Sequence, residues 1–282
     1  NTPTTMTYYQ QFAIADSHYK VSTNSPQISE KLRHLFAGFK THTPPESSPI
    51  PFEINQSADG RINVFPQAKK PRSYTSVDEC ISLLELRLVR SAFDKMHFIG
   101  IHSGAVVCNG KTILFPGRSG KGKTTLTLGC LLRGGSFLSD EMALIEPNTA
   151  NAYAFPRVLC NKTDLSLFQA LDDQNHLQQP RTTLFLNNSH CISPQAFDNI
   201  PQKQPCSIDA IIFPNYQLEH DTTLLPVSPI QSLQKLLKLT YKRTQNPQLL
   251  DTLGQIVESV PSFELTMNNL LEAIERVERF AN

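Results

Sequence analysis

The chain has 282 residues, of which 39% are hydrophobic and 18% are charged, a globular composition that can bury a substantial core. This length allows one large domain, or one domain with a small partner. The formal net charge is +1 and no long basic stripe occurs, so the chain is not expected to bind nucleic acid. It contains no apolar run of about 18 residues, so no membrane span is expected, and its first residues lack the basic and apolar regions of a signal peptide.

The first 74 residues are predicted to form a small β-rich region. Its predicted elements are, in order, a strand region at 8–23, a helix at 29–39, a loop at 41–53, a strand at 61–67 and a loop at 67–74. The strands are indicated by β-branched and aromatic residues, and the loops by proline, serine and lysine.

A larger domain is predicted for residues 75–282, and it begins with a helix. Ser76 can cap this helix, with Glu79 three residues later to complete a capping box. Two apolar runs then flank Asn109-Gly110, the strongest short signal for a β-hairpin. The second strand of this hairpin, Thr112–Phe115, leads directly into a glycine-rich loop.

The C-terminal part is predicted to alternate strands and helices. A buried strand is expected at 206–216, helices at 228–243, 248–260 and 268–282, and a further strand at 262–266. The polar, irregular stretch 163–204 is predicted to be either a substrate lid or a disordered loop.

The six cysteines are expected to be free thiols. They form no CxxC pair and do not stand with histidine at metal-ligand spacing. Buried free thiols are typical of a reducing compartment, so a cytoplasmic location is expected. The cysteines are Cys80, Cys108, Cys130, Cys160, Cys191 and Cys206.

The glycine-rich loop carries the complete phosphate-loop motif GxxxxGK[ST], with a strand before it and a helix after it. Glycines let backbone N–H groups turn toward phosphate oxygens, and the helix N-terminus adds partial positive charge. Lys123 is expected to reach the β and γ phosphates, and the Thr124 hydroxyl to join Mg²⁺. The nucleotide-binding residues are Gly117, Arg118, Ser119, Gly120, Lys121, Gly122, Lys123, Thr124 and Thr125.

An acidic pair, Asp140-Glu141, follows one short helix after this loop, inside the apolar run 136–145. A buried acidic pair is costly unless it is paired or bound to a metal. The functional interpretation is a metal ligand and a general base beside the γ-phosphate. The alternative is a salt-bridged surface turn.

These motifs together resemble the HPr kinase/phosphorylase superfamily. The resemblance is carried by "IHSGAVV", "GKTILFPGRSGKGKTTLTLGCLLRGGSFLSDE", "YAFPRVLCNK", "IDAIIFPNYQ", "LPVSPIQSLQKLL" and "SFELTMNNLLEAI", and it covers roughly residues 98–280. It implies an α/β (α+β) fold: a P-loop kinase core of the HPr kinase/phosphoenolpyruvate carboxykinase type with a mixed β-sheet, preceded by the small β-rich region.

The resemblance also implies roles for individual residues. Asp140 would accept the proton of a serine hydroxyl, Glu141 would hold Mg²⁺ together with Thr124, and His102 would lie near the γ-phosphate or the acidic pair. The chain departs from the bifunctional HPr enzymes in having Asp-Glu where they have Asp-Asp, and in lacking an "EIRG"-like signature. The resemblance therefore does not extend to HPr as the acceptor or to phosphorylase activity.

The expected function is that of an ATP-dependent kinase that transfers the γ-phosphate to a hydroxyl, serine foremost, of a peptide, protein or small molecule. Catalysis is assigned to Asp140, His102 and Lys123, and Mg²⁺ binding to Thr124, Glu141 and Asp140, with ATP and Mg²⁺ as cofactors. Two alternatives remain open: a nucleotide-binding accessory protein without transfer activity, and a small-molecule enzyme of the carboxykinase type. The oligomeric state, a monomer or a homo-oligomer, is also open.

Overall fold

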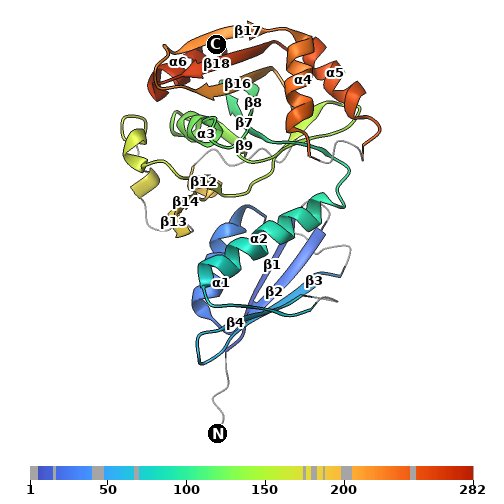
Figure 1. Cartoon of the computed structure of the whole chain (residues 1–282), viewed down its shortest axis with the longest axis vertical. Helices are drawn as coiled ribbons and strands as arrows, with labels where there is room; N and C mark the ends of the chain where they lie inside the picture. Colours follow the sequence, from blue (N-terminus) through green and yellow to red (C-terminus); the bar gives the residue numbers. More distant parts are fainter. Residues whose placement is uncertain are drawn as a thin grey trace. The chain divides into compact units, whose positions relative to one another are not determined.

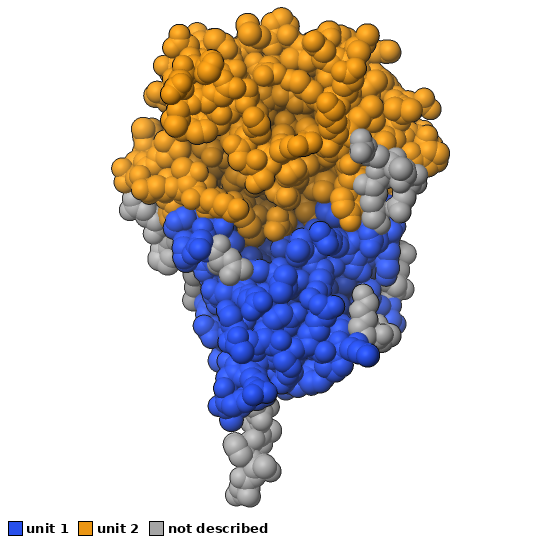
Figure 2. Space-filling model, viewed as in Figure 1, with its two compact units in different colours: residues 1–96, 183–193 blue, residues 97–182, 194–282 orange. Residues whose placement is uncertain are grey.

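The structure, a computed structural model, is of the mixed α/β class, as the sequence predicts. It describes residues 6–14, 17–39, 48–66, 70–173, 176–178, 183–186, 188–197, 205–241 and 246–281. The chain divides into two compact units: residues 1–96 with 183–193, and residues 97–182 with 194–282 (Figure 2).

The first unit is built on a five-stranded sheet of order β1-β2-β3-β4-β5, and α1 and α2 both contact β1 (Figure 1). Only the β2–β3 pair is parallel. Its elements are β1 (Tyr8–Ile14), β2 (Ser17–Thr23), α1 (Pro26–Leu35), a 3₁₀ turn (Ala37–Phe39), β3 (Ile50–Gln56), β4 (Ile62–Pro66), β5 (Arg72–Tyr74), α2 (Val77–Phe93), β13 (Thr183–Leu186) and β14 (Ser189–Ile192).

Two loops predicted in this unit contain strands. The end of the predicted loop 41–53 forms part of β3, and the end of the predicted loop 67–74 forms β5. Residues 41–47 and 67–69 lie outside the described residues. In β3, Ile54 is fully buried and the strand pairs with β2 and β4, so long-range pairing outweighs the proline and serine that favour a loop.

Helix α2 belongs to the first unit, although the sequence analysis assigns it to the larger domain. It contacts α1, and Tyr19 Oη on β2 donates a hydrogen bond of 3.2 Å to the Leu88 carbonyl. The division therefore falls at residues 96–97 instead of 74–75. The Ser76 cap is present, because its hydroxyl accepts from the Glu79 N–H at 3.3 Å.

The second unit contains a six-stranded mixed sheet of order β17-β18-β16-β8-β7-β9 and a four-stranded sheet of order β15-β11-β10-β6. Strand β16 runs parallel to β8 and β18, and β7 runs antiparallel to β8 and β9. Its strands are β6 (Ile99–Ile101), β7 (Ser103–Cys108), β8 (Lys111–Pro116), β9 (Ser136–Ser139), β10 (Ala143–Ile145), β11 (Asn151–Tyr153), β12 (Leu159–Asn161), β15 (Cys206–Ser207), β16 (Ala210–Tyr216), β17 (Thr223–Val227) and β18 (Ser262–Met267).

The helices of this unit cover both faces of the six-stranded sheet. Helix α3 (Lys123–Leu132) packs against β7, β8, β9 and α6 (Leu270–Ala281), which contacts β18. On the other face, one apolar cluster joins side chains of β8 and β16 to the four-stranded sheet, α4 (Pro229–Leu239) and α5 (Leu249–Ser259). Figure 1 shows α4 and α5 side by side. The hairpin at Asn109-Gly110 and the C-terminal elements are confirmed, whereas β17 was not predicted.

The described part of 163–204 contains regular structure. It includes 3₁₀ turns at Leu165–Phe168, His176–Gln178 and Pro194–Ala196, and the antiparallel hairpin β13–β14. The disordered interpretation is therefore wrong for these residues, and the rest of the stretch lies outside the described residues.

None of the six cysteines, all of which lie in the described part of the chain, forms a disulfide bond; Cys160 is half-buried and the others are buried. Among the described residues, no helix has the length and apolar character needed to cross a membrane.

Candidate functional site

The glycine-rich loop connects the end of β8 to the start of α3, in the strand–loop–helix setting that the motif requires. Gly120 and Gly122 have φ angles of 82° and 93°, a region that side-chain-bearing residues rarely adopt. Gly122 is the N-cap of α3, and a Cβ there would overlap the Met267 Cε atom. Because glycine has no side chain, no side chain of the N-cap residue bonds to the first N–H groups of α3. These N–H groups are therefore available to bind an anion.

Lys123 is held inside the site. It is only 5% exposed, and its Nζ donates to the Arg118 carbonyl at 3.3 Å. Burial lowers the pKa of Lys123, while the charges of Glu141 and Asp140 act to raise it. Burial removes water from the Lys123 ammonium group, so a bound polyanion such as a phosphate chain would stabilise its charge.

Asp140 lies directly against the loop. It is 4% exposed, and its Oδ2 accepts a hydrogen bond of 2.9 Å from the Thr124 hydroxyl. Burial raises its pKa from the ordinary 3.8 to about 6; the Thr124 hydrogen bond and the charges of Lys123 and Arg157 lower it, and the Glu141 charge raises it. The other carboxylate oxygen, Oδ1, is buried and has no hydrogen-bond partner among the described residues.

Glu141 turns toward His102. The His102 Nε2 atom lies 3.1 Å from Glu141 Oε1, and the two side chains are 28% and 48% exposed. Burial acts to raise the pKa of Glu141, but the hydrogen bond and charge of His102, together with the charges of Arg157 and Lys123, lower it on balance. Glu141 is thus held as an anion.

His102 occupies the one-residue break between β6 and β7. Its N–H donates to the Leu239 carbonyl at 2.9 Å, and its carbonyl accepts from the Gly117 N–H at 3.1 Å. These backbone bonds fix the histidine beside the first glycine of the loop. The Thr127 side chain of α3 fills the space beside Gly104, two residues along the same strand region.

The remaining loop residues face outward. Arg118, Ser119, Gly120 and Lys121 are exposed, and Thr125 is half-buried. The Lys121 Nζ donates to Asn215 Oδ1 at the end of β16 with a distance of 2.9 Å.

The two members of the acidic pair have different contacts. Asp140, and not Glu141, contacts Thr124, and the expected role of Glu141 in holding Mg²⁺ together with Thr124 stays a prediction. The reason is local: Asp140 follows β9 directly and is buried with it, whereas Glu141 points to the exposed side.

Arg157 adds a positive charge near the site. Its charge lowers the pKa of both Asp140 and Glu141, so a guanidinium stands within electrostatic reach of the acidic pair. Sequence reasoning missed Asn215 altogether, because a single asparagine at a strand end carries no motif.

The donor set fits Mg²⁺. Among the described residues, no group of three His, Cys, Asp or Glu side chains could hold a metal ion unaided. Mg²⁺ is commonly held by one or two carboxylates, waters and substrate phosphates. The unpartnered Oδ1 of Asp140, close to the Thr124 hydroxyl, is a hard oxygen of the kind that this ion prefers.

Comparisons with known proteins identify no family for this chain and only a distant structural likeness. A scan against protein-family models and a search of curated proteins find no match. Among solved structures, the chain is similar to the Hpr(Ser) kinase/phosphatase from Coxiella burnetii, with 14% identity over 64% of this chain and 96% of that chain and a TM-score of 0.29. A score this low is no more than a distant likeness, so the proposals below rest on the site geometry.

Proposed function

We propose that the chain is an ATP-dependent phosphotransferase of the HPr-kinase-related type, which transfers the γ-phosphate to a hydroxyl, serine foremost. The observation that carries the proposal is the contact between Asp140 and Thr124. It brings a buried carboxylate to the hydroxyl of a complete phosphate-loop motif, where a metal–phosphate group would be bound.

The roles follow from the surroundings of each side chain. Lys123 supplies a buried positive charge to the β and γ phosphates. Mg²⁺, when bound at Thr124 and the acidic pair, supplies further neutralisation of the phosphate charge. Asp140, a buried carboxylate in contact with the Thr124 hydroxyl, takes the proton of the acceptor hydroxyl.

His102 and Glu141 position each other in this proposal. The His102 ring holds Glu141 as an anion beside Asp140, and the backbone of His102 is tied to Gly117. The free thiols suit a reducing compartment, so a cytoplasmic location belongs to the proposal.

Calorimetry with Mg-ATP tests this function. Lys123→Met keeps the bulk of the buried side chain but removes its charge, so the affinity for Mg-ATP should fall at least about tenfold, or about 1.4 kcal/mol. Lys111→Met is the matched control, because Lys111 stands at the opposite end of β8 from the loop. Equal affinities for wild type and Lys123→Met would refute nucleotide binding by this loop.

A further inference from the structure

A groove runs across the second unit beside the phosphate loop. Two adjoining hollows, with volumes of about 370 and 430 Å³, share Lys235 and Lys238 of α4 and Glu264 of β18 as walls. The first hollow reaches the loop at Gly117, and the second reaches the edge strand β17 at Leu225. We call these two hollows together the α4 groove.

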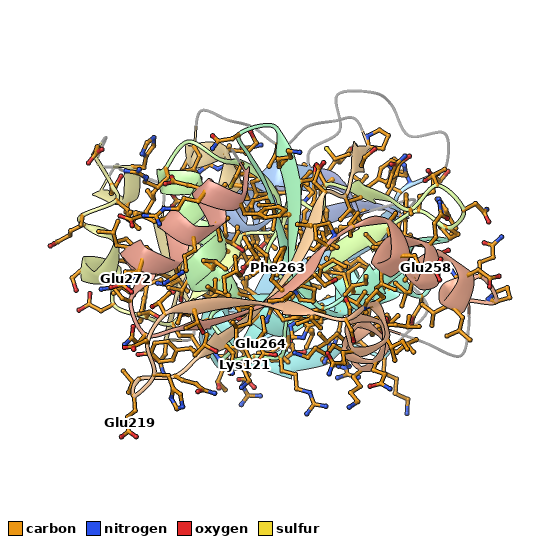
Figure 3. The ribbon with its side chains drawn as sticks, turned by 90° about the horizontal axis from the view of Figure 1, so that it is seen from above. Lys121, Glu219, Glu258, Phe263, Glu264 and Glu272 are labelled. Atoms are coloured by element: carbon orange, nitrogen blue, oxygen red, sulfur yellow. The ribbon has the colours of Figure 1, made fainter. Side chains whose placement is uncertain are left out.

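The α4 groove is positively charged. Among the described residues that line it, four are cations, Arg118, Lys121, Lys235 and Lys238, and one is a carboxylate, Glu264. Figure 3 shows Lys121 and Glu264 close together in the view from above. Four cations against one anion leave a net charge of +3, so the groove attracts an anionic occupant.

Two of the four cations are available to a ligand. Lys235 forms an ion pair with Glu264 and lies 4.9 Å above the centre of the Phe213 ring, and Lys121 is bonded to Asn215. Arg118 and Lys238 are exposed, and neither has a carboxylate partner in the described part of the chain.

The inner end of the groove adjoins the backbone of His102, the residue whose ring contacts Glu141. Gly117 and Leu239 both line the first hollow. The Gly117 N–H is bonded to the His102 carbonyl, and the His102 N–H to the Leu239 carbonyl, while the His102 ring contacts Glu141. The inner end of the groove is thus joined to the acidic pair through His102.

The outer end of the groove has an apolar wall. Leu225 of β17 is 60% exposed and is accompanied by Pro226 and Val227. Two hollows in a row, with cations along the middle and apolar side chains at one end, match an extended peptide better than a compact small molecule.

We propose that the α4 groove binds the phosphate acceptor, and that the acceptor is a peptide segment with acidic side chains close to its reactive hydroxyl. This inference rests on the proposed function. It names a substrate class for that function, an acidic peptide. The carboxylates of the peptide would pair with Lys238 and Arg118 while its hydroxyl reaches the acidic pair.

The test measures peptide binding without nucleotide, so it is independent of phosphoryl transfer. The probes are fluorescein-labelled decapeptides with alanine at the hydroxyl position: one with four Asp or Glu residues and one with Asn and Gln in their places. The acidic peptide should bind at least about tenfold more tightly by fluorescence anisotropy. Lys238→Ala should weaken its binding about fivefold, and Lys238→Arg should restore it.

Lys111→Ala is the charge-matched control, because Lys111 is an exposed lysine of the same unit at the far end of β8. Equal binding of the two peptides, or equal losses from Lys238→Ala and Lys111→Ala, would overturn the proposal. Displacement of the acidic peptide by saturating Mg-ATP would also overturn it, because the groove would then hold part of the nucleotide. Failure of ATP binding together with selective peptide binding would instead refute only the proposed function.

Discussion

The burial of Asp140 makes a prediction about stability. The pKa of this carboxyl rises from 3.8 to about 6 on folding, chiefly because of burial. An acid with a raised pKa stabilises the folded state below pH 3.8, and this contribution is lost as pH rises through 6. Wild-type protein should therefore become less stable over this range because of Asp140.

The size of the effect follows from the two pKa values. Each pH unit between them corresponds to about 1.4 kcal/mol, so ionising Asp140 costs the folded state about 3 kcal/mol at pH 8. About half of this cost is already present at pH 5. Asp140→Asn does not titrate, so its free energy of unfolding relative to wild type should rise by about 1.5 kcal/mol between these two pH values.

Urea denaturation of both proteins, in the presence of EDTA, measures this difference. The asparagine amide leaves a buried donor in place of Oδ1, which shifts the comparison by a constant amount at every pH. The quantity to follow is thus the change between about pH 5 and pH 8. A difference that is flat with pH, or that falls toward pH 8, would refute the buried-carboxylate argument.

Two further predictions concern neighbours of the site. His102→Asn removes the hydrogen bond and charge that lower the Glu141 pKa, so the Glu141 pKa should rise in a carboxyl NMR titration and turnover should fall roughly fivefold, or about 1 kcal/mol; an unchanged Glu141 pKa would contradict the pairing. Gly104→Ala places a Cβ on Thr127 Oγ1 and should cost about 1–3 kcal/mol of stability in thermal denaturation. That cost should shrink when Thr127→Ala is also present, and an unchanged cost would show that the two residues do not conflict.

The phosphate loop was predictable because its chemistry is local. A strand, three glycines, Lys123 and Thr124 stand within one short stretch, and their spacing alone fixes how the backbone turns. The acidic pair was found for the same reason, since it follows the loop after a single helix.

Contacts between segments that are distant in the sequence were harder to predict. The contact of Asp140 with Thr124 could not be distinguished from a contact of Glu141, because neighbouring residues differ only in which side of the chain they face. Lys235 and Lys238 look like the solvated face of an amphipathic helix. Their position beside Gly117 depends on how α4 packs on β16 and β18, which no local pattern contains.

The most direct test of phosphoryl transfer uses water as the acceptor, so that no substrate need be known. Mg-ATP is incubated with stoichiometric enzyme and followed by phosphorus NMR. Wild type should slowly convert ATP to ADP and inorganic phosphate, whereas Asp140→Asn, at Mg-ATP concentrations that saturate it, should convert ATP at least about a hundredfold more slowly. Binding of Mg-ATP by wild type without ADP formation, or equal conversion by both proteins, would contradict the account.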